Sequence, residues 1–238
     1  QHELKLKILE WCNEISIGSP ANELTVTMKQ FRIPAWPWQR LSFAMIYDLD
    51  HNGFKSFLTF LRYCEGAAIA PASIFMHLCG VKEVNGKYAP PEFDIRQAAR
   101  PLAIFSYLVH IMRDFEKDQR RHLNYFADDI LHKSGLNKEK LNELVQGQST
   151  DDRILTLFSE YKRFAGYYQK LAKETFRRLL PELPRKYQLS LHIIYELYSH
   201  LYEKIDPGNR TFSETDLNLS PAEVQQRINL TVSNFKPV

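Results

Sequence analysis

The sequence predicts an all-α fold, a bundle of long and partly kinked helices around a central apolar cavity. Apolar residues recur at helical spacing along most of the chain, and no alternating pattern long enough for a convincing strand interrupts them. Aromatic residues make up 13% of the chain, with 12 Tyr and 15 Phe, so a wide aromatic-lined interior is expected. With 238 residues and a hydrophobic content of 44%, the chain can bury a sizeable core, and we expect one domain over residues 1–238.

Four helices are expected in the first third of the chain. Apolar residues at positions 4, 6, 8, 9, 12 and 15 have helical spacing, and Pro20 lies just beyond them. A long apolar helix further on contains Pro71, where a kink is expected. The expected helices are Leu4–Ile17, a second that ends near Arg32, Trp38–Leu49 and Phe54–Leu78.

The rest of the chain continues the helical pattern after an expected loop at Val84–Lys87. A second long helix contains Pro101, and Ser134–Asn137 ends a short helix and caps the next. Ser220 and Pro221 have the residue types that open a last helix. The long helices expected here are 92–118, Asp151–Leu179 and Tyr187–Ile205.

Charge and cysteine content exclude several classes of protein. The net charge of +3 is too small, and the basic residues too dispersed, to indicate nucleic-acid binding. Cys12, Cys64 and Cys79 form no metal-binding motif and are typical of reduced, mostly buried thiols in a cytosolic protein. No signal peptide is visible, and the longest apolar run, 66–80, is too short to span a bilayer. We therefore expect a cytoplasmic location, with any membrane contact peripheral and on the inner face.

The most informative motif has two aspartates near the end of the predicted helix 92–118. Asp114 and Asp118 are four residues apart, so they share a helix face, which His110 and Tyr107 extend backwards. Four basic side chains surround the pair: Arg113, Lys117, Arg120 and Arg121. Carboxylates with cations suggest a site for a magnesium-bound phosphate or diphosphate. The alternative is a solvated helix end with ion pairs, and spacing alone does not separate the two.

Two other motifs have simpler explanations. The segment Asp48–Gly53 imitates the start of a calcium-binding EF-hand loop, but Thr59 stands where a bidentate Glu is needed. A run of small residues follows Tyr63, and Tyr63, Ala67, Ala70 and Ile74 fall on one helix face. Small side chains admit either a ligand or a neighbouring helix. We expect a linking turn at the first motif and favour helix packing at the second.

The combination of these motifs resembles the squalene/phytoene synthase family. The resemblance runs from about residue 4 to about residue 230. It includes Asp48–Leu49, Phe54, Ser56, the Tyr63–Cys64 pair, the second aspartate motif at 113–118, Tyr125–Phe126, Gly135–Leu136, and Tyr198 seven residues before Ile205.

The resemblance implies an isoprenoid synthase-like fold and a prenyltransferase that joins two allylic isoprenoid diphosphates head to head. Farnesyl and geranylgeranyl diphosphate are the usual substrates, and the product forms through a cyclopropyl intermediate. On this basis Asp114 and Asp118 are magnesium ligands, and Arg113 contacts diphosphate. The sequence does not indicate NADPH use, because no glycine-rich dinucleotide-binding turn is present. Whether the reaction needs NADPH stays open.

The resemblance also assigns roles to aromatic and basic side chains around the motif. Tyr63 and Tyr198 are the expected catalytic tyrosines. The remaining expected diphosphate-binding residues, beside Arg113, are Tyr107, His110, Lys117, Arg120 and Arg121. The oligomeric state is not predicted.

The chain departs from the family pattern at several places. The first aspartate motif is not found, and Leu4–Ile17 resembles the segment that follows it, so we expect the sequence to be incomplete at its N-terminus. Other departures are Tyr107 in place of Gln, His110 in place of Asn, Ile69 and Ala72 in place of Gly, and Leu123 in place of Arg. They leave open a second class, a non-catalytic helical protein that binds an isoprenoid or other lipid or assembles with partners.

Overall fold

The computed structural model describes residues 1–51, 53–147, 151–210 and 213–238. Within these ranges the chain is helical apart from loops and one small hairpin, which confirms the all-α prediction. The N-terminal helices are α1 (His2–Ile17), α2 (Glu23–Phe31), α3 (Trp36–Leu49), α4 (Phe57–Cys64) and α5 (Ala70–Gly80), with a π-helical turn at Glu65–Ile69. The later ones are α6 (Ile95–Arg113), α7 (Phe115–Arg120), α8 (Asp128–Lys133), α9 (Lys138–Gln146), α10 (Asp152–Leu179), α11 (Arg185–Lys204), α12 (Glu214–Leu217) and α13 (Pro221–Asn234), with a 3₁₀ turn at Leu180–Glu182.

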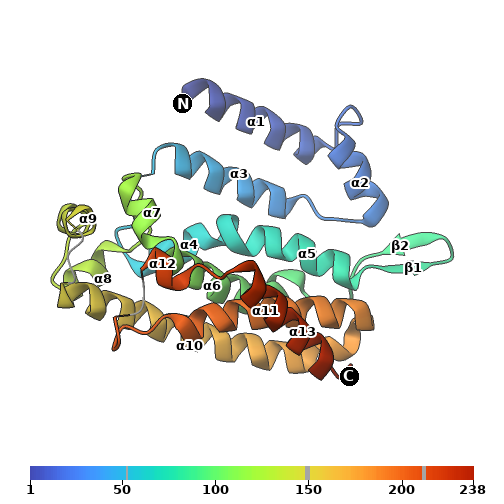
Figure 1. The fold of residues 1–238 in the computed structure, drawn as a ribbon. Coiled ribbons are helices and arrows are strands. Elements are labelled where there is room, and N and C mark those ends of the chain that lie inside the picture. Colours follow the sequence, from blue (N-terminus) through green and yellow to red (C-terminus); the bar gives the residue numbers. More distant parts are fainter. Residues whose placement is uncertain (52, 148–150, 211–212) are drawn as a thin grey trace.

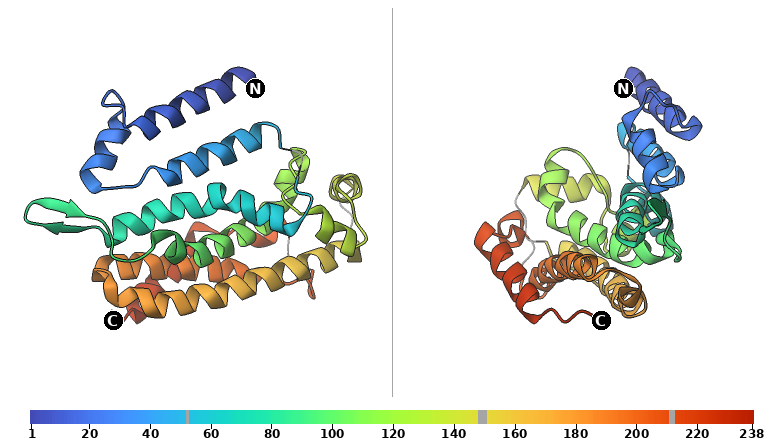
Figure 2. Two further views of the ribbon diagram at one scale, coloured as in Figure 1. Left: turned by 180° about the vertical axis from the view of Figure 1, so that it is seen from behind. Right: turned by 90° about the vertical axis from the view of Figure 1, so that its right-hand side faces the viewer.

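Helices α6 and α10 pack along each other at the centre of the bundle (Figure 1). On one side α5 packs on α6, α3 packs on α5 and the π-helical turn, and α1 packs on α3. On the other side α11 packs on α6 and carries α13. Figure 2 shows that α1, α2 and α3 extend from the bundle as a thin layer.

The core is largest where α6 meets α10. Leu108 and Met112 of α6 and Phe158 and Tyr161 of α10 are completely buried. Both helices begin with an aspartate cap: Asp94 accepts hydrogen bonds from the Arg96 and Gln97 amides, and Asp151 does so from the Arg153 amide. A well-packed helix pair with defined starts gives a rigid base for the side chains of α6.

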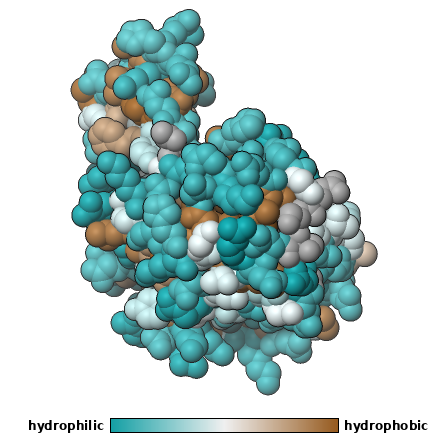
Figure 3. All heavy atoms as spheres, turned by 90° about the vertical axis from the view of Figure 1, so that its left-hand side faces the viewer, coloured by the Kyte–Doolittle hydropathy of each residue, from teal (hydrophilic) through white to brown (hydrophobic). Residues whose placement is uncertain are grey.

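The outer helices cover less apolar surface. Leu4, Leu6 and Leu9 of α1 and Phe43 of α3 are among the large hydrophobic residues that stay exposed. The face in Figure 3 is mostly hydrophilic, and apolar side chains gather on the projecting N-terminal layer. None of the described helices combines the length and apolar character that a bilayer span requires.

The first long helix is shorter and less regular than the prediction over 54–78. It starts at Phe57, because Ser56 accepts a hydrogen bond from the Thr59 amide and caps it. The π-helical turn then interrupts the α-helical pattern directly before Pro71. Pro71 lies in the first turn of α5, directly after the π-helical turn, so the irregularity lies in the turn that precedes the proline.

The second long helix was also predicted too long. It begins at Ile95 rather than near 92 and ends at Arg113, and α7 continues after a break at Asp114. The Asp118 amide still donates to the Asp114 carbonyl oxygen at 2.9 Å, which keeps the two aspartates one turn apart. Pro101 lies inside α6, as expected.

The loop predicted at Val84–Lys87 is the turn of a β-hairpin. Strand β1 (Lys82–Val84) pairs antiparallel with β2 (Lys87–Ala89). Asn85 and Gly86 both have positive φ, which suits the tight turn of a two-residue hairpin. Three-residue strands are too short to produce a recognisable alternation. Residue 52, within the segment that imitates a calcium loop, lies outside the described residues.

Candidate active site

A polar pocket of about 300 Å³ opens between the end of α3, α4, the second half of α6 and α7. Two of its walls carry carboxylates, Asp48 from α3 and the Asp114–Asp118 pair from α6 and α7. The full lining is Leu41, Ala44, Met45, Asp48, Tyr63, Ala67, Tyr107, His110, Ile111, Asp114, Asp118 and Tyr125.

Asp114 is held by both of its basic neighbours. Arg113 donates from Nε to Oδ1 at 2.7 Å and from a terminal nitrogen to Oδ2 at 3.0 Å, and His110 Nε2 lies 2.6 Å from Oδ2. Burial by itself would raise the pKa of Asp114, but the hydrogen bonds from His110 and Arg113 outweigh it and hold the pKa well below its usual range. Asp114 is therefore ionised at neutral pH.

Asp118 has a different environment on the next turn. Burial raises its pKa, and the neighbouring charge of Asp114 adds to this effect. His110, Lys117 and Arg121 oppose the increase, in that order of size. A cation between the two carboxylates would relieve their repulsion.

The aspartate pair fits a magnesium ion that is shared with a phosphate ligand. Magnesium is usually held by one or two carboxylates together with substrate phosphates and water. In the described parts of the chain, no group of three or more His, Cys, Asp or Glu side chains could hold a metal by itself. Asp114 and Asp118 can supply two ligands, and the remaining ones have to come from elsewhere.

Tyr63 lines the same pocket as the pair and is almost completely buried. Its hydroxyl donates to Asp48, with distances of 2.8 Å and 3.0 Å to the two carboxylate oxygens, and the Tyr107 hydroxyl donates to Tyr63 at 3.3 Å. Burial raises the pKa of Tyr63 and of Tyr107 far above the usual value, and it raises the pKa of Tyr125 to about 12. All three phenols therefore stay protonated at neutral pH.

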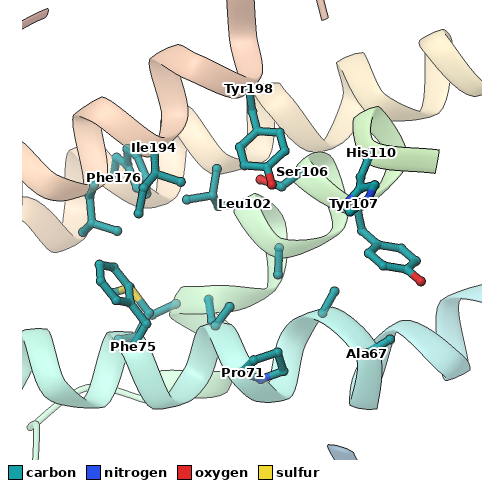
Figure 4. A pocket seen from close by; sticks show the side chains of 17 residues that line it. Ala67, Pro71, Phe75, Leu102, Ser106, Tyr107, His110, Phe176, Ile194 and Tyr198 are labelled. Carbon is teal, nitrogen blue, oxygen red and sulfur yellow. The ribbon is translucent and has the colours of Figure 1, made fainter. Parts of the chain in front are cut away.

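An apolar cavity of about 380 Å³ adjoins the polar pocket and lies between α5, α6, α10 and α11. Ala67, Tyr107 and His110 line both spaces. Figure 4 shows Pro71 and Phe75 of α5 facing Leu102 of α6, with Phe176 and Ile194 beyond. The two spaces together form a site with a charged end and an apolar end.

The predicted site residues are divided between these spaces. Tyr63, Tyr107, His110, Asp114 and Asp118 meet at the polar pocket, whereas Tyr198 lines the apolar cavity. Arg113 reaches the pocket through its contact with Asp114. The other basic residues, Lys117, Arg120 and Arg121, are exposed and line neither space, and Arg120 lies 3.3 Å from Glu116.

The small-residue run serves both of the purposes considered from the sequence. Ala67, Ala68 and Ala72 line the apolar cavity and give it room. Gly66 faces α3, and a Cβ atom at this position would come within 2.2 Å of the Arg40 carbonyl oxygen. This close approach brings the end of α3 beside the pocket.

Two polar residues of the pocket lining were not recognised as site residues from the sequence. Asp48 was noted for its place in an EF-hand-like segment, and Tyr125 as part of the family resemblance. Asp48 and Tyr63 are 15 residues apart on different helices, so no helical spacing relates them. The match to the family pattern at both positions was the available indication.

Comparison with known proteins identifies the family. The family model described as squalene/phytoene synthase matches residues 15–227. The chain belongs to the squalene/phytoene synthase family. Among curated proteins, it is similar to the chloroplastic phytoene synthases of an Oncidium hybrid cultivar, at 26% identity over 155 residues, and of Narcissus pseudonarcissus, at 25% over 150 residues. Each alignment covers 63% of this chain, and the chain spans about a third of each relative, 35% and 34%.

Solved structures share the fold. A dehydrosqualene synthase bound to a ligand has a TM-score of 0.72 and 16% identity, and the alignment covers 98% of this chain and 76% of the other. Squalene synthase HpnC from Alicyclobacillus acidocaldarius has a TM-score of 0.56 and 14% identity, over 76% of this chain and 65% of the other. These similarities confirm the isoprenoid synthase-like fold.

Proposed function

We propose that this protein joins two allylic isoprenoid diphosphates head to head, with magnesium-assisted loss of diphosphate. The observation that supports this proposal most strongly is that the polar pocket and the apolar cavity adjoin, with Ala67, Tyr107 and His110 lining both. An allylic diphosphate has the same division, with a charged head and a long apolar tail.

In this proposal the polar pocket binds and orients the diphosphate head. Asp114 and Asp118 would hold magnesium, which would neutralise charge on the departing diphosphate. Arg113 keeps Asp114 ionised and oriented, and the neutral phenol of Tyr63 faces the head. The allylic C–O bond breaks, its electron pair leaves with diphosphate, and the double bond of the second substrate attacks the resulting carbocation. Loss of a proton to the released diphosphate then closes the cyclopropyl ring, and a second C–O cleavage releases the remaining diphosphate before the hydrocarbon forms.

The apolar cavity binds a prenyl tail and protects the cation. Leu102, Phe75 and Phe176 present apolar surface without a nucleophilic heteroatom, and this surface would exclude water from around the carbocation. Tyr198 is the proposed catalytic tyrosine on this side. Farnesyl and geranylgeranyl chains are the candidate tails.

A second candidate is a non-catalytic isoprenoid-binding protein of the same fold. It is favoured by the engagement of both Asp114 oxygens by Arg113 and His110, which a metal ion would have to displace or share. Such a protein would bind the ligand without breaking its C–O bond.

The release of diphosphate distinguishes the two candidates. Purified protein is incubated with farnesyl or geranylgeranyl diphosphate, with magnesium or with chelator, and released diphosphate and hydrocarbon products are measured. The proposal predicts magnesium-dependent release and a product with twice the carbon number of the substrate. Tight substrate binding without release would support the second candidate and contradict the first.

The long-tailed substrates also bear on location. Farnesyl and geranylgeranyl chains partition into lipid, so a cytoplasmic enzyme would take them up at a membrane surface. Peripheral contact with the inner face of the membrane therefore stays part of the proposal, and co-sedimentation with anionic vesicles would test it.

A further inference from the structure

We propose that Asp48 is a positioning residue, which fixes the direction of the Tyr63 hydroxyl through a chain of hydrogen bonds from Tyr107 to Tyr63 to Asp48. The inference rests on the proposed function and deepens it, because it concerns how the polar pocket orients its buried phenol.

The hydrogen bonds define where the Tyr63 proton points. A phenol has one proton to donate, and both Asp48 oxygens lie within 3.0 Å of the Tyr63 hydroxyl. Tyr107 donates to the Tyr63 oxygen from the other side at 3.3 Å. With the proton directed at Asp48, Tyr63 presents only its remaining lone-pair direction to the pocket.

The ring of Tyr63 is fixed as well as its hydroxyl. Its centroid lies 5.1 Å from that of Phe54, 5.4 Å from that of Tyr47 and 6.2 Å from that of Tyr107. Aromatic packing on several sides restricts the ring, and Asp48 removes the rotation of the hydroxyl that would remain.

Asp48 has no evident purpose in folding. The residue as a whole is exposed although its carboxylate is partly buried in the pocket, and it lies in the last turn of α3, where the helix dipole disfavours a negative charge. Burial raises the pKa of Asp48, while the hydrogen bond from Tyr63 opposes this increase. A carboxylate kept where the helix disfavours it, and in contact with a pocket tyrosine, points to a role in the site.

Asp48 is also separate from the metal-binding pair. In the described residues no carboxylate forms a three-membered metal-binding group with Asp114 and Asp118. A direct ligand would raise the magnesium requirement when it is removed, whereas a positioning residue would lower the turnover at saturating magnesium. These two roles therefore give different kinetic results.

The first test uses the activity. We expect Asp48→Ala to lower kcat by about 10- to 100-fold with little change in KM or in the magnesium requirement. Asp48→Asn should recover most of kcat, since its amide oxygen can still accept from Tyr63. In the double variant with Tyr63→Phe, Asp48→Ala should cost no further activity, because the two residues act as a unit. Additive losses, or a raised magnesium requirement, would overturn the inference.

The second test does not depend on activity. In protein labelled with ¹³Cζ-tyrosine, the Tyr63 signal is assigned from its loss in Tyr63→Phe. It should shift in Asp48→Ala, return towards its original position in Asp48→Asn, and stay unchanged in Asp50→Asn. Asp50 is the matched control, an exposed carboxylate that caps the same helix outside the pocket. An unshifted Tyr63 signal in Asp48→Ala overturns the inference, and an inactive wild-type protein overturns only the proposed function.

Discussion

The polar pocket and the apolar cavity share one helix but are built in different ways. On one face of α6, Leu102 and Ser106 line the apolar cavity, and His110 and Asp114 line the polar pocket further along. The apolar cavity has room because side chains on the π-helical turn and on α5 are small. The polar pocket instead depends on hydrogen bonds between residues from separate helices, as between Asp48 and Tyr63. A change in the cavity should therefore alter which tail binds, and a change in the pocket should alter the reaction itself.

The largest expected effect is in the polar pocket. Asp114→Asn removes a charge that Arg113 and His110 hold in place, and we expect at least about a 100-fold loss of diphosphate release. The matched control is Asp152→Asn, which removes an exposed carboxylate that pairs with Arg210 away from the site. Equal activity of the two variants would contradict the role of Asp114.

A change in the apolar cavity should act on the tail. Ala72→Phe places a ring in the cavity, and we expect KM for farnesyl diphosphate to rise by about 10-fold or more. The affinity for inorganic diphosphate with magnesium, measured by calorimetry, should not change, because the head binds elsewhere. Ala222→Phe, on the exposed face of α13, is the control. Equal losses of affinity for both ligands would show that the two spaces are not separate in function.

The contact between α3 and the π-helical turn should affect stability and the polar pocket together. In Gly66→Ala the added Cβ would meet the Arg40 carbonyl oxygen and the Ala44 side chain. We expect α3 to move away and the free energy of unfolding to fall by about 1–3 kcal/mol, as measured by denaturant titration. Asp48 moves with α3, so kcat should fall while the apolar cavity is unchanged. An unaltered stability would mean that α3 is less tightly held than this contact indicates.

The smallest expected effect is on stability in acid. The folded pKa of Asp114 lies below the unfolded value of about 3.9, so its ionised form stabilises the fold fully above that value. This stabilisation is lost as the pH falls through the lower folded pKa. The difference in free energy of unfolding between wild type and Asp114→Asn should therefore shrink from about pH 5 to about pH 2. A difference in free energy of unfolding that does not change with pH would contradict the ion pairs of Asp114 with Arg113 and His110.

Local spacing predicted the parts of the site that lie on one helix. His110, Asp114 and Asp118 follow each other at four-residue spacing, and the Asp118–Asp114 backbone hydrogen bond preserves their alignment although the helix breaks between α6 and α7. The break at Asp114 does not change the four-residue spacing, so the spacing could not predict it. The pattern of small residues after Tyr63 was compatible with close helix packing and with room for a ligand. In the tertiary structure Gly66 packs against α3, and Ala67, Ala68 and Ala72 line the apolar cavity.

The contacts between distant segments could not be predicted from spacing. The Asp48–Tyr63 hydrogen bond depends on how closely α3 approaches the π-helical turn, which Gly66 allows. The exposed position of Arg121 depends in the same way on the direction of the chain after α7. Helical spacing gives a face for each residue, but it does not give the helix that this face meets.

In the proposed function, one isoprenoid diphosphate occupies both the polar pocket and the apolar cavity. The most direct test is a crystal structure of the protein with magnesium and a farnesyl thiodiphosphate, whose C–S bond resists cleavage. We expect the diphosphate to bind beside Asp114 and Asp118, and the tail to lie between α5 and α6 and extend toward Phe176. A diphosphate bound at the exposed basic residues of α7, or a tail outside the cavity, would contradict it.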